Sequence, residues 1–368
     1  MLINSTAMYN EEIPSFAFSG LPTKVIFSQN SLVAIKKEIE ERDFKRLMIV
    51  TTRSQANLAQ NIALALDENC VGIFSEAKIH TPLHVSLEAL AMFRNLDCDS
   101  VLSVGGGSAI GLGKALGYRT SAPLLGLPTT YAGSEMTSIF GETNKKLKIT
   151  LSDERAQFRA VIYDPQLSLS LPSHVSMCSG LNALAHAIES LYGVNKNSMT
   201  NAIASEAIKL LVEALPKIKK NPLDLISRTM AMQGAWLAGS CLSVVGMGLH
   251  HSLCHVLGGA FDLPHAETHA VILPHVVRYN LSHLPSHLQT FLFKYPGNTI
   301  ADQFQAFTLT LETPTSLREL GLPKSAINQA AKLTLERKYW NPQFYDEETI
   351  ESLLVSAWNG ALSFKRGV

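Results

Sequence analysis

The stretch SVLSVGGGS at Ser100–Ser108 joins a short apolar run to three consecutive glycines. The run is typical of a buried β-strand, and the next residues, Ala109–Leu116, have the pattern of a helix. Glycines let backbone N–H groups approach a phosphate closely, and the amino end of a helix adds partial positive charge. The spacing matches neither the common dinucleotide fingerprint nor a Walker A loop, so a tight turn without a ligand is the alternative. The candidate cofactor-binding residues here are Gly105, Gly106, Gly107 and Ser108.

Apolar runs alternate with helical patterns on both sides of this stretch. Further strands are predicted at Lys24–Phe27, Leu47–Thr51, Val71–Phe74, Leu124–Leu127 and Ala160–Tyr163. Helices are predicted between them at Ser31–Arg42, Ser54–Leu66 and Leu83–Asn95. This alternation indicates a Rossmann-like, mostly parallel sheet with helices on both faces. Ligands bind beyond the carboxyl ends of such strands, so the residues that follow each strand are the ones to inspect.

A second polar loop, Pro128–Glu135, follows the strand predicted at Leu124–Leu127. It offers hydroxyl groups from Thr129, Thr130 and Ser134, where a second phosphate or a ribose would lie. Two polar loops after neighbouring strands favour a dinucleotide over a simple turn.

The pattern changes near Asp164. Beyond it, strand-like runs almost vanish, and helices are predicted at Ser179–Tyr192, Met199–Leu215 and Leu225–Leu242. The sequence therefore predicts an α/β plus all-α protein. Its dinucleotide-binding α/β domain is expected over residues 1–170 and its helical catalytic domain over residues 171–368.

Composition limits the classes of partner. The 368 residues are 46% hydrophobic and 17% charged, with Lys+Arg and Asp+Glu both at 31. No global basic field favours nucleic acid or an anionic membrane, so a small molecule is the expected partner. The first residues, Met1–Pro14, lack the pattern of a secretory leader, and the five cysteines include no Cys-x-x-Cys pair. We therefore expect a cytoplasmic protein with reduced thiols.

The second half carries a concentration of imidazoles. His251 and His255 are four residues apart, so in a helix they project from one face. The following glycines and Pro264 would end that helix and bring His265 back towards the same face. Asn182 and His186 share the same four-residue spacing on another predicted helix. Imidazoles arranged in this way serve metal ligation, proton transfer or carbonyl polarisation.

The residue at position 182 determines how strongly the sequence favours a metal site. An aspartate there would complete a set of one carboxylate and three imidazoles suited to a divalent transition metal. The neutral amide of Asn182 is a weak ligand. It therefore makes a metal less favoured without excluding one.

Several of these motifs together resemble the iron-containing, or group III, alcohol dehydrogenases. The resemblance is carried by the loops Gly105–Ser108 and Pro128–Glu135, the helix from Asn182 to His186, and the pattern of His251, His255 and Leu263–His265. Within that family, Pro128–Thr137, Gly248–Gly259, Phe261–Ala270 and Tyr339–Pro342 resemble the maleylacetate reductase branch. The resemblance implies a dehydroquinate synthase-like arrangement, with the active-site cleft between the two domains, and commonly a homodimer. It also adds Tyr131 to the cofactor contacts.

The resemblance implies NAD(P)H-dependent reduction of the C=C bond of maleylacetate, a dicarboxylate, to 3-oxoadipate in the breakdown of aromatic compounds. Hydride addition beta to the ketone drives electrons onto its oxygen. We predict that His251, with His255 or Tyr339, polarises the carbonyl and that one of them or a water supplies the proton. His186 and His265, if protonated, would offset the substrate's negative charge. Asn182 fits this branch, in which the ligand aspartate is replaced, so no metal is expected.

The second strand bears on the choice between NADH and NADPH. A dehydrogenase that strongly prefers NAD would have an acidic residue after this strand to bind the ribose. The chain has Thr51, Thr52 and Arg53 instead. Thr51 and Thr52 are candidate cofactor contacts, and Arg53 would favour a 2′-phosphate, so both cofactors are expected to serve.

Metal-assisted cyclisation of a sugar phosphate, without net redox change, also stays open for a related fold, but it would require a fuller metal site and a phosphate-binding cluster that the sequence does not show. Two other functions fit the same residues. One is a metal-dependent alcohol or polyol dehydrogenase of the same fold, which would need bound iron or zinc. The other is a non-catalytic nucleotide-binding protein, which the presence of both the cofactor loops and the histidines disfavours.

Overall fold

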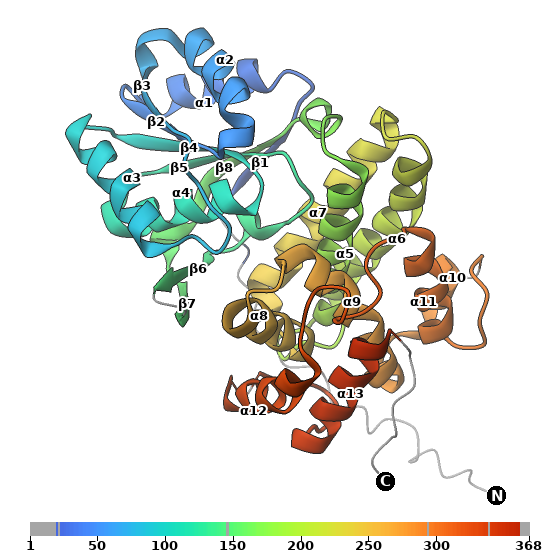
Figure 1. The fold of residues 1–368 in the computed structure, drawn as a ribbon. Coiled ribbons are helices and arrows are strands. Elements are labelled where there is room, and N and C mark those ends of the chain that lie inside the picture. The colour runs from blue at the N-terminus through green and yellow to red at the C-terminus, as the bar shows by residue number, and fades with distance from the viewer. Residues whose placement is uncertain (1–19, 21–22, 145–146, 293, 338, 361–368) are drawn as a thin grey trace, which may run out of the picture.

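Six parallel strands form one sheet in the amino-terminal half of the chain (Figure 1). The computed structural model describes residues 20, 23–144, 147–292, 294–337 and 339–360. In spatial order the strands are β1 (Lys24–Phe27), β8 (Phe158–Tyr163), β5 (Leu124–Pro128), β4 (Ser100–Gly105), β2 (Leu47–Val50) and β3 (Cys70–Phe74). Every pairing is parallel, so the carboxyl ends of the strands meet at the same end of the sheet.

Alternate residues of each strand face opposite sides of this sheet. In β2, Leu47 and Ile49 pack into one core with the first two helices, and Met48 and Val50 pack into another with the next two. These helices are α1 (Ser31–Glu41) and α2 (Ala56–Leu66) on one face, and α3 (Leu83–Asn95) and α4 (Gly107–Thr120) on the other. The sheet is buried on both faces, which explains why its strands read as continuous apolar runs.

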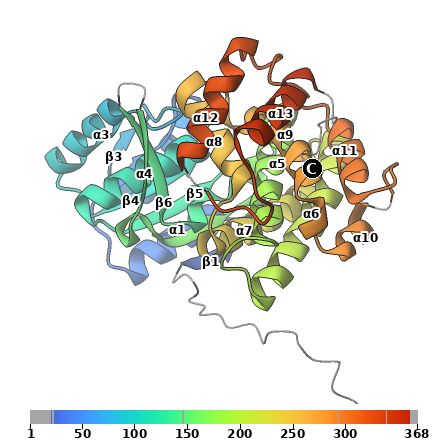
Figure 2. The same ribbon diagram turned by 90° about the horizontal axis from the view of Figure 1, so that it is seen from below.

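The remainder of the described chain after β8 is helical. Its helices are α5 (Ser173–Ser190), α6 (Ser198–Lys220), α7 (Leu225–Val245), α8 (Leu249–Phe261), α9 (His265–Tyr279), α10 (Gln289–Leu292), α11 (Ile300–Thr310), α12 (Ile327–Arg337) and α13 (Glu347–Asn359). Helix α5 is buried along most of its length between α6, α7 and α9 (Figure 2). Within the described ranges, no helix has the length and apolar character needed to cross a membrane.

A buried arginine joins the helical half to the α/β half. Arg228, on α7, donates to the hydroxyl oxygens of Tyr131 and Ser176, at 3.1 and 2.7 Å, and to the carbonyl oxygens of Leu171 and Pro222, at 3.1 and 2.9 Å. Tyr131 lies in the loop after β5, whereas Leu171 lies in the link to α5. Four hydrogen bonds satisfy a charge that would otherwise be costly to bury. The loop after β5 is therefore fixed against the helical half.

Two glycines bring the same loop and α7 into backbone contact. A Cβ atom added to Gly239 would lie 2.1 Å from the carbonyl oxygen of Gly133. Gly133 itself has φ 75°, in the left-handed region that favours glycine. Neither backbone can move away cheaply, so the chain needs a residue without a side chain at both positions.

The predicted fold class is confirmed: a parallel α/β sheet is followed by a helical region. The predicted helix at Ala109–Leu116 is longer in the structure, because α4 begins at Gly107 and continues past Gly117 to Thr120. Gly117 is required there, since a Cβ would lie 2.5 Å from the carbonyl oxygen of Arg155. Strands β6 (Ile139–Asn144) and β7 (Leu147–Ser152) also pair with each other, antiparallel. The domain boundary at residue 170 stays a prediction.

Candidate active site

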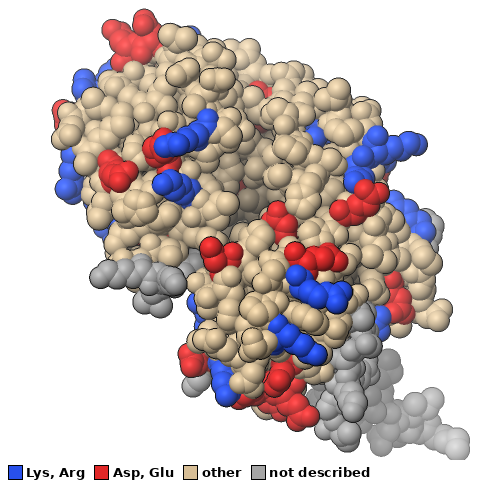
Figure 3. All heavy atoms as spheres, in the orientation of Figure 1, with Lys and Arg blue, Asp and Glu red and all other residues tan. Residues whose placement is uncertain are grey.

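A cleft of about 530 Å³ lies between the two halves of the molecule. The space-filling view shows the surface hollowed between the two lobes, with acidic and basic side chains interspersed around it (Figure 3). One wall comes from the loops after β2, β4 and β5, and the other from α5, α8 and the start of α9. The carboxyl ends of the strands therefore face the histidines across one space.

The glycine loop after β4 forms a cradle open to this cleft. Gly106 precedes α4, and no side chain caps the helix there. A Cβ on Gly107 would meet no protein atom within 4 Å, whereas one on Gly106 would lie 2.8 Å from Cγ2 of Thr130. The first N–H groups of α4 are thus available at an unobstructed helix end, which is the geometry that binds phosphate. These residues fit the pyrophosphate of a dinucleotide.

The structure divides the predicted cofactor residues into two groups. Six of them line the cleft: Thr52, Gly106, Gly107, Ser108, Thr130 and Ser134. The other four, Gly105, Thr51, Thr129 and Tyr131, do not line it. Gly105 is the last residue of β4 and accepts from the N–H of Thr129.

The side chains of Thr51 and Tyr131 do not reach the cleft in this structure, so their contact with the cofactor stays a prediction. Both are fully buried. The Thr51 hydroxyl donates to the carbonyl oxygen of Val104, at 2.8 Å, which fastens β2 to β4. The Tyr131 hydroxyl accepts from Arg228. The first hydrogen bond joins β2 to β4, and the second joins the loop after β5 to α7. Both residues therefore support the α/β side of the cleft without lining it.

Arg53 is already paired with a carboxylate. Its Nε donates to both carboxylate oxygens of Glu76, at 2.7 and 2.8 Å, and its side chain is 82% exposed. Neither residue lines the cleft. Because Arg53 is paired with Glu76 outside the cleft, it is less available to bind the 2′-phosphate of NADPH.

His251 is held by a buried carboxylate that the sequence did not single out. Its Nδ1 lies 2.6 Å from Oε2 of Glu189, on α5, and its Nε2 is buried without a protein partner. The His251 ring also stacks on that of His186, with centroids 4.9 Å apart. Both histidines line the cleft. A signal for Glu189 was present, since it follows His186 by three residues and so shares its side of α5.

His186 and Asn182 present neutral groups to the cleft. Burial, with smaller contributions from His251 and His265, lowers the pKa of His186 well below its ordinary value. The side-chain oxygen of Asn182 is buried without a partner. A protonated His186 that offsets substrate charge is therefore not supported by the structure.

His255 connects the cleft to Tyr339. The Tyr339 hydroxyl lies 3.5 Å from Nδ1 of His255, and the two rings are perpendicular. His255 and His265 both line the cleft, and their rings are stacked with centroids 6.4 Å apart. Tyr339 does not line it. Tyr339 is therefore placed to act through His255.

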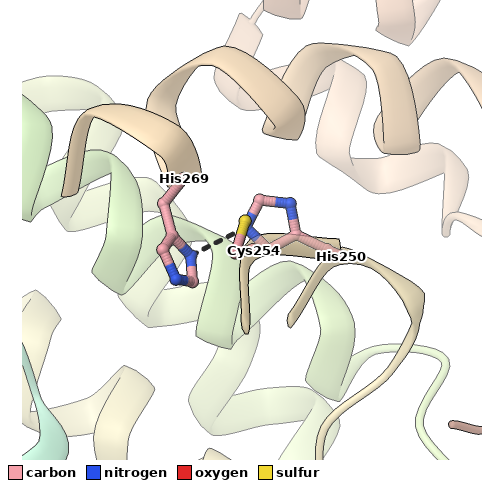
Figure 4. Close-up of side chains that lie close together, drawn as sticks. All are labelled: His250, Cys254 and His269. Atoms are coloured by element: carbon pink, nitrogen blue, oxygen red, sulfur yellow. Dashed lines mark hydrogen bonds between the residues drawn. The ribbon is translucent and has the colours of Figure 1, made fainter. Parts of the chain in front are cut away.

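A second histidine pair lies behind His251. Nε2 of His250 is 2.9 Å from Nδ1 of His269, and the Cys254 thiol lies 3.7 Å from the same His250 nitrogen (Figure 4). The three side chains are close enough to suggest a metal site. Burial, however, raises the pKa of the Cys254 thiol well above its ordinary value, which disfavours the thiolate that would bind a metal. Because the facing nitrogens share a hydrogen bond, we interpret the group as a packed polar cluster.

The chain is similar over nearly its whole length to known proteins. The profile of the iron-containing alcohol dehydrogenases matches residues 22–165, and that of the Fe-containing alcohol dehydrogenase family, C-terminal, matches residues 176–358. The maleylacetate reductase of Sphingobium indicum is 41% identical over 94% of this chain and 98% of its own. The chain belongs to the iron-containing alcohol dehydrogenase family. It is accordingly an NAD(P)H-dependent oxidoreductase.

Solved structures agree with this assignment. The crystal structure of maleylacetate reductase from Agrobacterium tumefaciens superposes with a TM-score of 0.90, at 39% identity, over 95% of this chain and 100% of that one. An iron-containing alcohol dehydrogenase from Corynebacterium glutamicum also gives a TM-score of 0.90, at 35% identity, over 96% of this chain and 100% of that one. The fold is therefore that of the family from β1 to the last helices.

The residues at the family's metal position do not fit a divalent metal well. The donor set is Asn182, His186, His251 and His265, which contains no carboxylate, although anionic oxygen or sulfur ligands commonly help to hold such ions. Among the described residues, the ligand atoms of these three histidines do not form a group within 4.8 Å of one another. Glu189 cannot readily take the missing role, because it is bonded to Nδ1 of His251 and to backbone N–H groups.

Proposed function

We propose that this protein reduces the C=C bond of maleylacetate to give 3-oxoadipate, using NADH or NADPH. Curated relatives from Sphingobium indicum and Rhizobium sp., 41% and 40% identical over 94% of the chain, are maleylacetate reductases. The observation that carries the proposal is the cleft itself. The glycine cradle after β4 and the unpartnered Nε2 of His251 belong to opposite walls of this cleft.

In the proposed reaction, NAD(P)H supplies a hydride to the carbon beta to the substrate ketone. The C=C electron pair moves towards the ketone, and negative charge develops on its oxygen. Nε2 of His251 would donate a hydrogen bond to that oxygen when protonated. His255, supported by Tyr339, or a water in the cleft would deliver a proton to the alpha carbon. One hydride and one proton complete the reduction.

The substrate's carboxylates need positive potential. His265 is the first residue of α9, which has no side-chain cap, and residues 264–267 line the cleft. The N–H groups of this first turn supply partial positive charge that suits a carboxylate. Glu267, in the same turn, carries an opposing negative charge, and its carboxylate lies 3.0 Å from Nε2 of His174. We propose that α9 orients one end of the dicarboxylate, and the neutral His186 packs beside it.

We further propose that the reaction needs no resident metal, that the enzyme acts in the cytoplasm, and that it is a homodimer. The first point is supported by the neutral donor set around Asn182. The dimer rests on the family resemblance, and the location rests on the expectation drawn from the sequence.

Oxidation of NADH on addition of maleylacetate tests the function, with 3-oxoadipate identified by mass spectrometry. The matched test compares protein dialysed against a chelator with protein resupplied with Fe²⁺ or Zn²⁺. We expect equal turnover of maleylacetate in both. If the chelated sample is inactive, and the metal-loaded sample turns over a simple aldehyde or polyol but not maleylacetate, the protein is a metal-dependent alcohol dehydrogenase. NADH binding without turnover of either substrate class would indicate a non-catalytic protein.

A further inference from the structure

Glu189 makes three hydrogen bonds from a position behind the cleft. Its Oε2 accepts from the N–H of Gly248, at 2.8 Å, and from Nδ1 of His251, at 2.6 Å. Its Oε1 accepts from the N–H of His250, at 2.7 Å. Its side chain is 1% exposed and does not line the cleft. The carboxylate therefore cannot meet a substrate directly, and its effect must pass through what it holds.

The same carboxylate caps α8, the helix that carries His251. Gly248 is the residue before α8, and no side chain of its own caps the helix. Glu189 takes that place from α5, where its negative charge also suits the amino end of the helix. A Cβ at Gly248 would lie 2.8 Å from Oε1 of Glu189. Glycine at 248 and glutamate at 189 thus fit each other.

These contacts determine which nitrogen of His251 meets the cleft. With its Nδ1–H donated to Glu189, the neutral ring carries its lone pair on Nε2. Stacking on His186 restricts the ring plane. The ring is held from two sides, with Nε2 left unpartnered.

We propose that Glu189 is a positioning residue for His251: it holds one proton on Nδ1, so that Nε2 faces the substrate carbonyl and donates to it when the ring carries a second proton. The inference rests on the proposed function, since that function assigns His251 its catalytic role. Glu189 also balances the positive charge that His251 carries when it holds two protons, as buried carboxylates beside catalytic imidazoles do.

The variant Glu189→Gln is a sharp perturbation because glutamine has a single acceptor oxygen. If its NH₂ group occupies the Oε2 position, it faces the Gly248 N–H and forces His251 to accept on Nδ1, which moves the ring proton to Nε2. If the amide is flipped, the NH₂ group faces the N–H of His250. In either orientation, the NH₂ group faces a backbone N–H, so two donors face each other and one hydrogen bond is lost.

We expect Glu189→Gln to lower kcat about 10²- to 10⁴-fold with KM changed only a few-fold, on the scale seen when a catalytic histidine loses its orienting carboxylate. Glu189→Asp keeps the charge on a shorter side chain and should recover part of kcat. The control is Glu38→Gln, a buried glutamate on α1 that pairs with Lys24 and Arg42 away from the cleft. It should leave kcat unchanged. Equal kcat in wild type and a folded Glu189→Gln would overturn the proposal.

NMR of ¹⁵N-histidine-labelled wild type tests the proton position without any substrate. The His251 signal is assigned from the spectrum of His251→Asn. We expect a proton on Nδ1 of wild type in either charge state. In Glu189→Gln we expect a larger fraction of the neutral ring in the Nε2–H form, because one of the two amide orientations favours it. A neutral wild-type ring protonated on Nε2 alone overturns the inference. Because the spectrum needs no turnover, a failure of the proposed substrate leaves this result interpretable.

Discussion

Gly107→Ala is expected to weaken NADH binding without destabilising the protein. A Cβ at this position would meet no protein atom within 4 Å, and Gly107 is the first residue of α4, where alanine is compatible with the backbone. Replacing glycine by alanine at a compatible site removes freedom from the unfolded chain. The free energy of unfolding should therefore stay the same or rise by up to about 1 kcal/mol.

The added methyl group would project into open space beside the glycine cradle. A phosphate kept from the N–H groups of the helix end loses at least one charge-assisted hydrogen bond, which contributes about 1.5–3 kcal/mol. Each 1.4 kcal/mol is a factor of ten in affinity, so the Kd for NADH should rise roughly tenfold to a hundredfold.

Fluorescence titration of NADH and denaturant unfolding measure the two quantities on the same samples. Gly239→Ala is the contrasting control, because its Cβ would lie 2.1 Å from the carbonyl oxygen of Gly133 and overpack the junction with α7. It should lower the free energy of unfolding by about 1–3 kcal/mol. If Gly107→Ala binds NADH as tightly as wild type, the loop after β4 is not the phosphate site and the cofactor placement fails.

Four further outcomes are expected. Tyr131→Phe should lower the free energy of unfolding by about 1–3 kcal/mol in urea, because Arg228 loses a buried acceptor, yet change the KM for NADH little. Burial lowers the pKa of Lys114 from 10.5 to about 7 in the folded protein. Between these two pH values the unfolded chain binds the additional proton, so the contribution of Lys114 to stability rises with pH above 7. The Tm of Lys114→Met should therefore rise less from pH 7 to pH 9 than that of wild type. His251→Ala should lower kcat by about 10² or more, whereas an unchanged kcat would remove His251 from the mechanism. Tyr339→Phe should lower kcat by a similar factor if Tyr339 assists His255, and full activity would make the 3.5 Å contact incidental.

The fold could be predicted because its strongest signals are local. Apolar runs bounded by glycine or polar residues marked the strands of the sheet, and β1 and α3 have the predicted bounds, Lys24–Phe27 and Leu83–Asn95. Helix ends were less predictable. Helix α4 extends beyond its predicted end and includes Gly117, which packs against the backbone of Arg155, a contact that no local pattern reveals.

The site was only partly predictable, because residue spacing locates a side chain on an element but not its direction. Thr51 and Tyr131 follow strands as cofactor contacts should, yet their hydroxyl groups bond to Val104 and Arg228, which lie 53 and 97 residues away in the chain. Glu189 was overlooked for the same reason. Its partners at the start of α8 lie 59 to 62 residues further along.

The charges around His251 explain why an asparagine at position 182 is compatible with a glutamate at position 189. Glu189 brings a negative charge into a region where burial lowers the pKa of His186, His250 and His269 well below the ordinary value. A proton on His251 makes its pair with Glu189 neutral, which reduces the cost of burying both. An aspartate at 182 would add a second buried negative charge beside an incoming dicarboxylate, and a divalent cation would be needed to balance it. With asparagine there, the pair of Glu189 and a doubly protonated His251 has no net charge, which is the balance that the proposed metal-free site requires. The Nε2–H of that ring can then donate to the oxygen that becomes negative during reduction.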